Sequence, residues 1–463
     1  NLRSRNDTCN PPSQGGKESV PEQRWGFADR RQAGDDKAVI TVDGAQDLVS
    51  ALARARSGDT LKLAAGTYDT DLKIRDASYA RGLTITSEDP DNPAVFTGNL
   101  EVANSTNITI TDIDFEASPE VGLSGQDQAR LNGSENITLE RVKIAGHIPT
   151  AAEGVDPYSD EAARLKIIEG YGYGTALEIR LSDGIRLVDV EITDVRQAVS
   201  LFDSENVTFD GLDMHDVREG INMNDVRGVT VKDSHFYDFK PWLPLNDPAN
   251  DGSGFDHPDM IQYWGVNSDT GVHDITITNN LFEMGEGELT QTIFGHMGKA
   301  DPGVTATNFN ISNNVIFNGH SNAITIGGVI GGQINNNVIL PNDDIPVGSM
   351  TRIRISSTVS DVDVIGNVMV RTNGDHALQN WTDEQKAAQN IRIEDLTLLS
   401  RDPDSPDYWR VWQAQNADQL LGGGQGGGST GGVDLTGSSS ADNLEGGEGN
   451  DVLNFASVTV AGV

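Results

Sequence analysis

Short segments in which apolar and polar residues alternate recur along most of the chain. Each opens on Asn, Asp or Gly, continues with Ile, Leu, Val or Phe at every second position, and carries mostly polar residues between them. The segments are Asn107–Ile113, Asn136–Val142, Gly184–Val190, Asn206–Phe209, Gly228–Val231, Asp274–Ile277, Asn308–Ile311, Asp361–Val364 and Asn390–Ile393. Several neighbours start about 22 to 30 residues apart, the length of one three-strand coil. The pattern therefore predicts an all-β fold, a right-handed three-sheet parallel β-helix with the apolar side chains inside.

Four asparagines share one position relative to these repeats. Asn280, Asn314, Asn337 and Asn367 each lie five residues after the first inward position of a repeat. Stacked coils would place them above one another at the same tight turn. Asparagine tolerates left-handed backbone angles, and its amide can bond the turns above and below. We therefore predict an asparagine ladder at this corner.

A second family of short strands precedes the repeats. Its members are Leu177–Arg180, Val199–Phe202, Ile221–Asn224, Met260–Tyr263, Gln291–Phe294, Ile324–Gly327 and Arg352–Ile355. When they are stacked they form one parallel sheet whose outward side chains include Asn222, Asn224, Gln262, Thr325 and Arg354. Because this face is rich in hydrogen-bonding groups, we expect the functional site on it.

The ends of the chain differ from the repeats. Residues 1–37 are polar and aperiodic, which predicts a tail or strap. Leu48, Val49, Leu52 and Ala53 recur at helical spacing, which indicates a short helix covering the open end of a β-helix over 38–420. A Gly-rich linker is expected over 421–434, followed by a separate fragment over 435–463.

Net charge and composition limit the classes of partner that the protein is expected to bind. The formal net charge of −37 argues against nucleic acid and against anionic membrane surfaces, both of which attract Lys and Arg clusters. No apolar run reaches about 18 residues, so no membrane insertion is expected. The single cysteine, Cys9, excludes an intrachain disulfide. We expect a monomer whose partner is a polysaccharide, and an acidic one if the leading hypothesis below is right.

A calcium motif stands near the end of the chain. Gly446–Asn454 fits the nonapeptide G-G-x-G-x-D-x-U-x, with Ala441–Leu444 as a partial copy before it. Glycine carbonyls and carboxylates are oxygen ligands of the kind Ca²⁺ prefers. The candidate metal ligands are Asp442, Gly447, Gly449 and Asp451. The motif is similar to the RTX repeat, and this resemblance implies type I secretion without a cleaved signal peptide and an extracellular protein that folds with Ca²⁺.

Candidate chemistry gathers on and beside the polar sheet. The segment 242–264 combines aromatic residues, suited to stacking on sugars, with Asp and His, suited to proton transfer. His, Lys and Arg follow on later coils and could neutralise a carboxylate. The candidate catalytic residues are Asp256, His257, Asp259, His296, Lys299 and Arg352. The candidate substrate-binding residues are Asn222, Asn224, Trp242, Gln262, Tyr263, Trp264, His320 and Arg354.

Resemblances to known families sharpen these expectations. Ser57–Tyr68, Leu83–Pro90 and Val95–Gly98 resemble the start of alginate-lyase and chondroitinase B-type β-helices, although the Asn-Lys-Ser and Arg-His-Gly motifs of those enzymes are absent. Gly254–Asp259 is similar to the Asp-Pro-His segment of mannuronan C5-epimerases, with Pro and His exchanged, which implies roles for Asp256 and His257. Asp256 and Asp259, His320, and Arg352–Arg354 follow one another in the order of the corresponding groups of polygalacturonase-like hydrolases.

The leading hypothesis is a secreted polysaccharide lyase that cleaves a uronate-containing polysaccharide by β-elimination. Arg352, Arg354 or Ca²⁺ would neutralise the uronate carboxylate, and His257, His296 or Lys299 would remove the C5 proton. Three alternatives stay open. They are a glycoside hydrolase using paired Asp residues, a C5-epimerase, and a non-catalytic glycan-binding adhesin. A uniformly acidic groove would favour the hydrolase.

Overall fold

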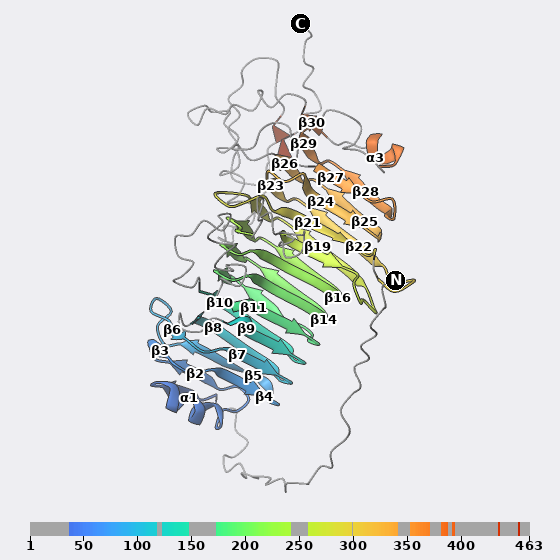
Figure 1. Cartoon of the computed structure of the whole chain (residues 1–463). Helices are drawn as coiled ribbons and strands as arrows, with labels where there is room; N and C mark the ends of the chain where they lie inside the picture. The colour runs from blue at the N-terminus through green and yellow to red at the C-terminus, as the bar shows by residue number, and fades with distance from the viewer. Residues whose placement is uncertain are drawn as a thin grey trace, which may run out of the picture. The chain divides into compact units, whose positions relative to one another are not determined.

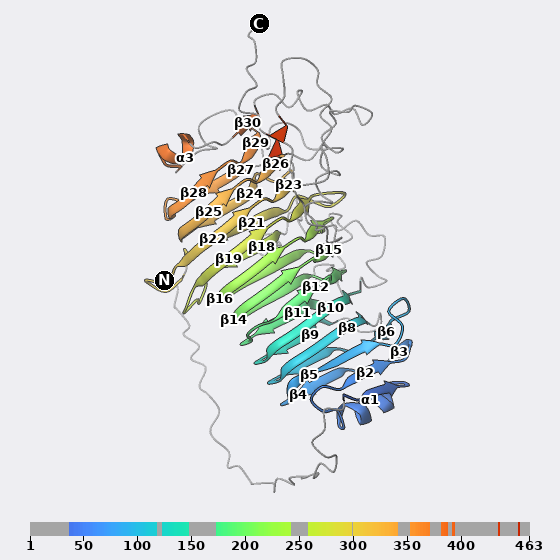
Figure 2. The same ribbon diagram turned by 180° about the vertical axis from the view of Figure 1, so that it is seen from behind.

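The computed structural model describes residues 37–117, 123–147, 173–241, 258–298, 300–340, 352–370, 381–387, 391–393, 434–435 and 452–453. The chain divides into two compact units, Asn1–Asp36 and Lys37–Val463, and every described residue belongs to the second. The strands from β1 to β30 stack along one axis as a right-handed parallel β-helix (Figures 1 and 2). The predicted fold class is therefore confirmed.

Each coil contributes to three sheets, and all the described ladders run parallel. The first sheet holds the recurring repeat and contains β1 (Val39–Val42), β2 (Thr60–Leu63), β5 (Ser78–Ser87), β12 (Arg186–Val188), β19 (Val272–Thr278), β22 (Ala306–Ser312), β25 (Val329–Asn335) and β28 (Ser360–Ile365). The second contains β3 (Gly66–Tyr68), β6 (Ala94–Phe96), β13 (Glu191–Thr193), β15 (Asp213–His215), β17 (His235–Tyr237), β20 (Leu281–Glu283), β23 (Val315–Phe317), β26 (Val338–Leu340), β29 (Val368–Val370) and β30 (Ile391–Ile393).

The third sheet is the polar one predicted above. It contains β4 (Leu72–Arg75), β7 (Leu100–Ala103), β9 (Leu123–Asn132), β11 (Tyr173–Arg180), β18 (Asp259–Trp264), β21 (Gln291–His296), β24 (Asn322–Gly327) and β27 (Arg352–Ile355). Four long strands turn a corner and serve two sheets. They are β8 (Thr106–Glu116), β10 (Glu135–Ala145), β14 (Gln197–Asp210) and β16 (Glu219–Lys232).

The bore is filled by apolar side chains in register. On the third sheet Ile261 pairs with Ile293, Ile293 with Ile324 and Ile324 with Ile353, and all four are buried. Burying one such side chain stabilises the fold by about 1.5–3 kcal/mol. Because every coil adds its own inward set, the core extends along the whole stack instead of closing into a sphere.

The corners explain why each repeat begins with Asn, Asp or Gly. The opening residues have φ between 53° and 69°, the left-handed region that these residue types tolerate best. They are Asn107, Asn136, Gly184, Asn206, Gly228, Asp274, Asn308 and Asp361. The sharp turn at this position lets the chain leave the third sheet and enter the first.

The asparagine ladder is confirmed. Asn280, Asn314, Asn337 and Asn367 are fully buried. The backbone N–H of Asn280 donates to Asn314 Oδ1 at 3.0 Å, and that of Asn314 donates to Asn337 Oδ1 at 3.1 Å. The side-chain amide of Asn314 also donates to Ile277 O at 2.9 Å. These bonds satisfy buried backbone groups at the corner between the first and second sheets.

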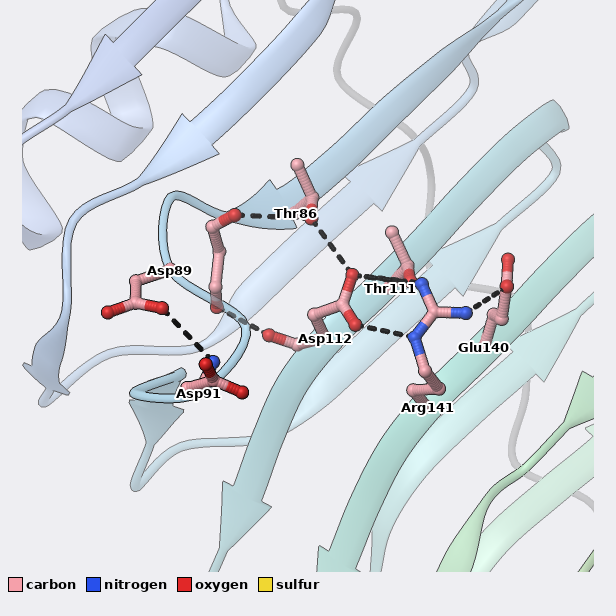
Figure 3. A network of polar contacts seen from close by, with 8 residues as sticks. Thr86, Asp89, Asp91, Thr111, Asp112, Glu140 and Arg141 are labelled. Atoms are coloured by element: carbon pink, nitrogen blue, oxygen red, sulfur yellow. Dashed lines mark hydrogen bonds and ion pairs between the residues drawn. The ribbon is translucent and has the colours of Figure 1, made fainter.

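A network at the same corner, nearer the N-terminal end of the stack, joins neighbouring coils on the outside of the helix. Arg141 donates from Nε to Asp112 Oδ1 at 2.7 Å and from Nη2 to Thr111 Oγ1 at 2.9 Å (Figure 3). Thr86 donates to the same carboxylate at 3.3 Å. Burial by itself would raise the pKa of Asp112, but the bonds from Arg141 and Thr111 outweigh it and the pKa is lowered. The network therefore ties three consecutive coils together.

Two short helices flank the stack in the described part. Helix α1 (Ala45–Leu52) lies at the end that carries β1 to β3 (Figure 1) and buries Leu48 and Ala51. The helix expected near residue 48 is thus confirmed, although Val49 is 59% exposed. Helix α3 (Asp383–Ala387) was not predicted, and it begins with reciprocal bonds between Thr382 and Gln385.

The described part of the chain also contains a short strand pair that is not part of the large sheet system. No described helix is long and apolar enough to cross a membrane. Strands β31 (Asp434–Leu435) and β32 (Val452–Leu453) form a separate parallel pair. The predicted tail 1–37 falls outside the described residues except for Lys37. The predicted calcium ligands Asp442, Gly447, Gly449 and Asp451 lie wholly outside them.

Candidate functional site

The outer face of the third sheet carries three rows of side chains that run along the stack. The edge row stands where each strand begins and consists of Gln197, Glu219, Asp259, Gln291, Asn322 and Arg352. The central row consists of Ser200, Asn222, Gln262, Phe294, Thr325 and Arg354. The far row consists of Phe202, Asn224, Trp264, His296 and Gly327. We refer to this surface, over β14 to β27, as the site face.

A carboxyl pair occupies the middle of the edge row. Asp259 and Glu219 lie on neighbouring strands, each two residues before the paired Ile261 and Ile221. Asp259 is 0% exposed, and its Oδ2 accepts a hydrogen bond from Gln262 Nε2 at 2.6 Å. Its Oδ1 has no hydrogen-bond partner within the described part of the chain.

The ionised form of Asp259 is disfavoured in this pair. Burial, and then the negative charge of Glu219, raise the pKa of Asp259 well above its ordinary value. Desolvation and a nearby like charge both disfavour the ionised form, so Asp259 keeps its proton to a higher pH than an exposed carboxyl group does. Asn222, in the central row, donates to Glu219 Oε2 at 3.3 Å and to Gln197 Oε1 at 2.8 Å.

Amides continue the edge row toward the C-terminal strands. Asn322 Nδ2 donates to Gln291 Oε1 at 2.5 Å, and Arg354 Nη1 donates to Asn322 Oδ1 at 2.7 Å. This chain of bonds joins β21, β24 and β27 and fixes the direction of each amide. Its last member is a guanidinium, so the row ends on a positive charge.

The two arginines of β27 differ from the other arginines of the third sheet. Arg75 is paired with Glu101 at 2.8 Å, Arg130 with Asp127 and Glu178, and Arg180 with Asp203. Among the described residues, no carboxylate forms an ion pair with Arg352 or Arg354. Arg352 also has a buried Nε without a partner in that part of the chain. Burial and the neighbouring Arg354 lower the pKa of Arg352. Two like charges held together in this way form a site that favours an anion.

Histidines stand beside this cationic end. The backbone N–H of Asn322 donates to His320 Nδ1 at 3.1 Å, which leaves the proton of the neutral ring on Nε2. Burial and the charge of Arg354 lower the pKa of His320, so its ring is neutral at neutral pH. His296 is exposed, and its Nδ1 accepts from Gly298 N at 3.2 Å. When either ring is neutral, its Nδ1 accepts a backbone N–H and its Nε2–H remains as a donor on the opposite side of the ring.

Aromatic rings lie among the polar groups. Phe202, Trp264 and Phe294 are half-buried on the site face, and Phe294 makes an edge contact with His296 at 6.2 Å between ring centroids. Half-exposed rings on a polar surface are suited to stacking on the apolar faces of sugars.

Several predicted site residues take other places. Tyr263 is 1% exposed and points into the bore, so it cannot reach a ligand on the site face. The alternation of the strand puts it on the same side as Ile261. Asn222 and Asn224 are on the predicted face but are only 6% exposed. Trp242, Asp256, His257 and Lys299 lie outside the described residues.

The prediction from sequence missed part of the site. Glu219, Gln291 and Asn322 were not named, although each stands two residues before the first inward Ile of its strand. That constant offset from Ile221, Ile293 and Ile324 was a usable signal. The alternation of apolar and polar residues marks only the inward positions, so it does not reveal this offset.

A metal centre is not evident in the described part of the molecule. No group of three or more His, Cys, Asp or Glu side chains there is arranged to hold a metal ion. The calcium prediction therefore depends on Asp442, Gly447, Gly449 and Asp451, whose geometry is not described.

Comparisons with known proteins add context. No family model matches the chain, and no curated protein matches it. Among solved structures, it is similar to a mannuronic acid specific polysaccharide family 6 lyase from human gut microbiota (10% identity, TM-score 0.42, 83% of this chain and 95% of that one). It is also similar to an alginate lyase from Paenibacillus sp. (14%, 0.31, 77% and 98%) and to PfbA, a surface adhesin of Streptococcus pneumoniae (12%, 0.41, 70% and 86%). The sequence identities and TM-scores are too low for these similarities to indicate the activity of this protein.

Proposed function

We propose that this protein is a polysaccharide lyase that cleaves a uronate-containing polysaccharide by β-elimination. The observation that carries the proposal is the arginine pair of β27, Arg352 and Arg354. On strands β21, β24 and β27 there are two arginines and one histidine but no carboxylate, in a chain with a formal net charge of −37. Such a local reversal of charge is what a uronate carboxylate requires.

The arginines would act on the acidity of the substrate. A uronate carboxylate bound by Arg354 and Arg352 loses much of its negative charge, so the C5 proton becomes easier to remove. A base then takes this proton, the C5–H electrons form the C4–C5 double bond, and the C4–O bond breaks. The leaving oxygen takes a proton from an acid. One product therefore carries an unsaturated uronate at its new non-reducing end, and the other carries a new reducing end.

The described histidines suit donation better than proton abstraction. In their neutral forms His320 and His296 carry the proton on Nε2, because each Nδ1 accepts a backbone N–H. The neutral rings can thus donate hydrogen bonds, His320 to the uronate carboxylate and His296 to the leaving oxygen. The base is then assigned to Lys299 or His257, which lie outside the described residues.

Calcium and secretion are further parts of the proposal. The nonapeptide Gly446–Asn454 supports Ca²⁺ binding by the C-terminal region and export to the extracellular space. Calcium would there stabilise the appended region, while the chemistry is assigned to the side chains of the site face. Calorimetric titration with Ca²⁺ should show binding that Asp451→Ala weakens, and equal binding by both proteins would remove this motif from the proposal.

A hydrolase is the second candidate, and one observation favours it. Glu219 and Asp259 are a pair of carboxyl groups in which the pKa of Asp259 is raised, and acid and base catalysis on a glycosidic bond requires two carboxyl groups of different pKa. Against it, Asp259 is fully buried and cannot touch a substrate in this conformation. The lyase is therefore the better supported assignment.

One assay separates the candidates. The protein is incubated with Ca²⁺ and a panel of acidic and neutral polysaccharides, and both the ultraviolet absorbance of unsaturated uronides and new reducing ends are measured. A lyase produces both signals together on an acidic polymer. Reducing ends without absorbance would reject the lyase in favour of the hydrolase. If neither signal appears on any polymer, nuclear magnetic resonance of the recovered polymer tests for a C5-epimerase, and an unchanged polymer that still binds indicates an adhesin.

A further inference from the structure

Charge changes sign along the edge row of the site face. The row starts with Gln197 and the carboxyl pair Glu219 and Asp259, passes through the uncharged amides of Gln291 and Asn322, and ends on Arg352. Neighbouring strands are about 4.8 Å apart, so β18 and β27 are separated by three spacings, or roughly 14 Å. The acidic and basic ends are thus too far apart to neutralise one another directly, but near enough to contact one extended oligosaccharide.

The acidic end resists additional negative charge. Burial and the charge of Glu219 both oppose the ionisation of Asp259 there and raise its pKa. A substrate carboxylate brought to the same place would meet the same charge of Glu219 and would lose water as well. Asp259 could not compensate for it, since its side chain is fully buried and does not reach a ligand on the site face. The cationic end is the opposite case, because Arg352 and Arg354 have no carboxylate partner among the described residues.

The groups between the two ends are uncharged. Gln262, Gln291 and Asn322 offer amide donors and acceptors, which match sugar hydroxyls. Phe294 and Thr325 complete the central row there. Nothing on strands β21 and β24 offers a second cation to a second carboxylate, apart from the exposed ring of His296.

From this order of charges we propose that the site face binds a polysaccharide in which uronate units are separated by uncharged units. A uronate carboxylate lies at Arg352 and Arg354, and an uncharged unit lies over Glu219 and Asp259. This inference rests on the proposed function, because it deepens the same site by naming the class of polymer. Polymers of contiguous uronates are then poor ligands, since a carboxylate on every unit places one beside Glu219.

Binding measurements test the inference separately from catalysis. Dissociation constants are measured by calorimetry, at constant ionic strength, for oligoglucuronates and for gellan-derived oligosaccharides of the same length. Both ligands contain glucuronate, contiguous in the first and set between neutral sugars in the second. We expect the spaced ligand to bind at least about tenfold more tightly, because like charges brought together cost affinity.

A matched pair of variants identifies the cause. Glu219→Gln should improve binding of the contiguous ligand severalfold and change binding of the spaced ligand little. Glu178→Gln removes a carboxylate from the same sheet, one that is paired with Arg130 at 3.1 Å, and should leave the preference unchanged. Arg354→Gln should weaken both ligands.

The outcomes are distinct from those of the cleavage assay. Equal or tighter binding of the contiguous ligand by the unmodified protein, no binding of either, or no effect of Glu219→Gln overturns the inference, even if unsaturated products form. A preference for the spaced ligand that Glu219→Gln reduces supports it, even if cleavage proves hydrolytic and the lyase proposal fails.

Discussion

The hydroxyl of Tyr263 forms two hydrogen bonds with the backbone of Gly327, which lies 64 residues later and two coils away. It accepts from the N–H of Gly327 at 2.8 Å and donates to its carbonyl at 3.1 Å. The ring reaches across the intervening coil because Gly295 has no side chain. A Cβ there would lie 2.2 Å from the ring. One buried side chain thus connects β18 to the end of β24, where Gly327 is paired with His296.

Removing this hydroxyl should destabilise the fold. Tyr263→Phe leaves the buried N–H of Gly327 without its acceptor, which costs about 1–3 kcal/mol of unfolding free energy. Urea unfolding followed by circular dichroism measures the change. Val49→Ala, at a position 59% exposed, serves as the control and should alter little. An unchanged midpoint in Tyr263→Phe would show that Gly327 finds another acceptor.

The absence of a side chain at Gly295 should matter only because the ring of Tyr263 fills that space. Gly295→Ala places a methyl group against Tyr263 and should cost roughly 1–3 kcal/mol through overpacking. In a Tyr263→Ala background the same methyl group has room, so its cost should largely disappear. A double-mutant cycle with both substitutions measures this coupling. Additive effects would contradict the contact between the two residues.

The asparagine ladder should be a major source of stability. Asn314→Ala removes the acceptor of two donors of Asn280 and the donor to Ile277. We expect a loss of at least ~2 kcal/mol, because the remaining groups stay buried without partners. Asn310→Ala, on the outer surface of the same strand region, should cost no more than about 0.5 kcal/mol. Comparable losses at the two positions would mean that the ladder contributes no special stability.

Asp259 should make stability depend on pH in a particular direction. Its pKa is raised in the folded protein, so the folded state binds more protons than the unfolded state above the ordinary value of 3.8. The contribution of Asp259 to stability therefore declines as pH rises from there through the raised pKa. Asp259→Asn, which stays neutral, should be more stable than the unmodified protein at alkaline pH, and this advantage should shrink on acidification.

Unfolding free energies at several pH values measure the comparison. Glu219→Gln should lessen the pH dependence as well, because it removes one of the two causes of the raised pKa. If Asp259→Asn is instead less stable at alkaline pH, Asp259 is ionised and held by positive groups.

The arginine pair should control activity without controlling the fold. Arg354→Gln is expected to lower kcat/KM on a cleaved acidic polysaccharide by roughly 10²-fold, as for loss of a group that stabilises developing charge. Arg75→Gln, an ion-paired arginine on the same sheet, should leave kcat/KM roughly unchanged. Both variants should unfold at a similar temperature. A similar kcat/KM for the two variants would remove Arg354 from the mechanism.

The repeating architecture could be predicted from the amino-acid sequence alone. Residues such as Asn107 and Asp274 mark corners because few other residue types accept left-handed angles, and the Asn280 ladder follows from a fixed offset. The sequence also predicted which sheet presents polar groups, as at Gln262 and Arg354. These features are local or strictly periodic, so a pattern along the chain records them.

Contacts between residues of different coils could not be predicted in this way, because they depend on how the coils stack. Gln291 bonds to Asn322 31 residues away and Gln197 to Asn222 25 residues away, because loops of different length separate otherwise equivalent strands. Tyr263 was misplaced because a shift of one residue moves a side chain from the outer face to the bore. The raised pKa of Asp259 likewise depends on burial and on Glu219 from another coil, and no spacing along the chain can express either quantity.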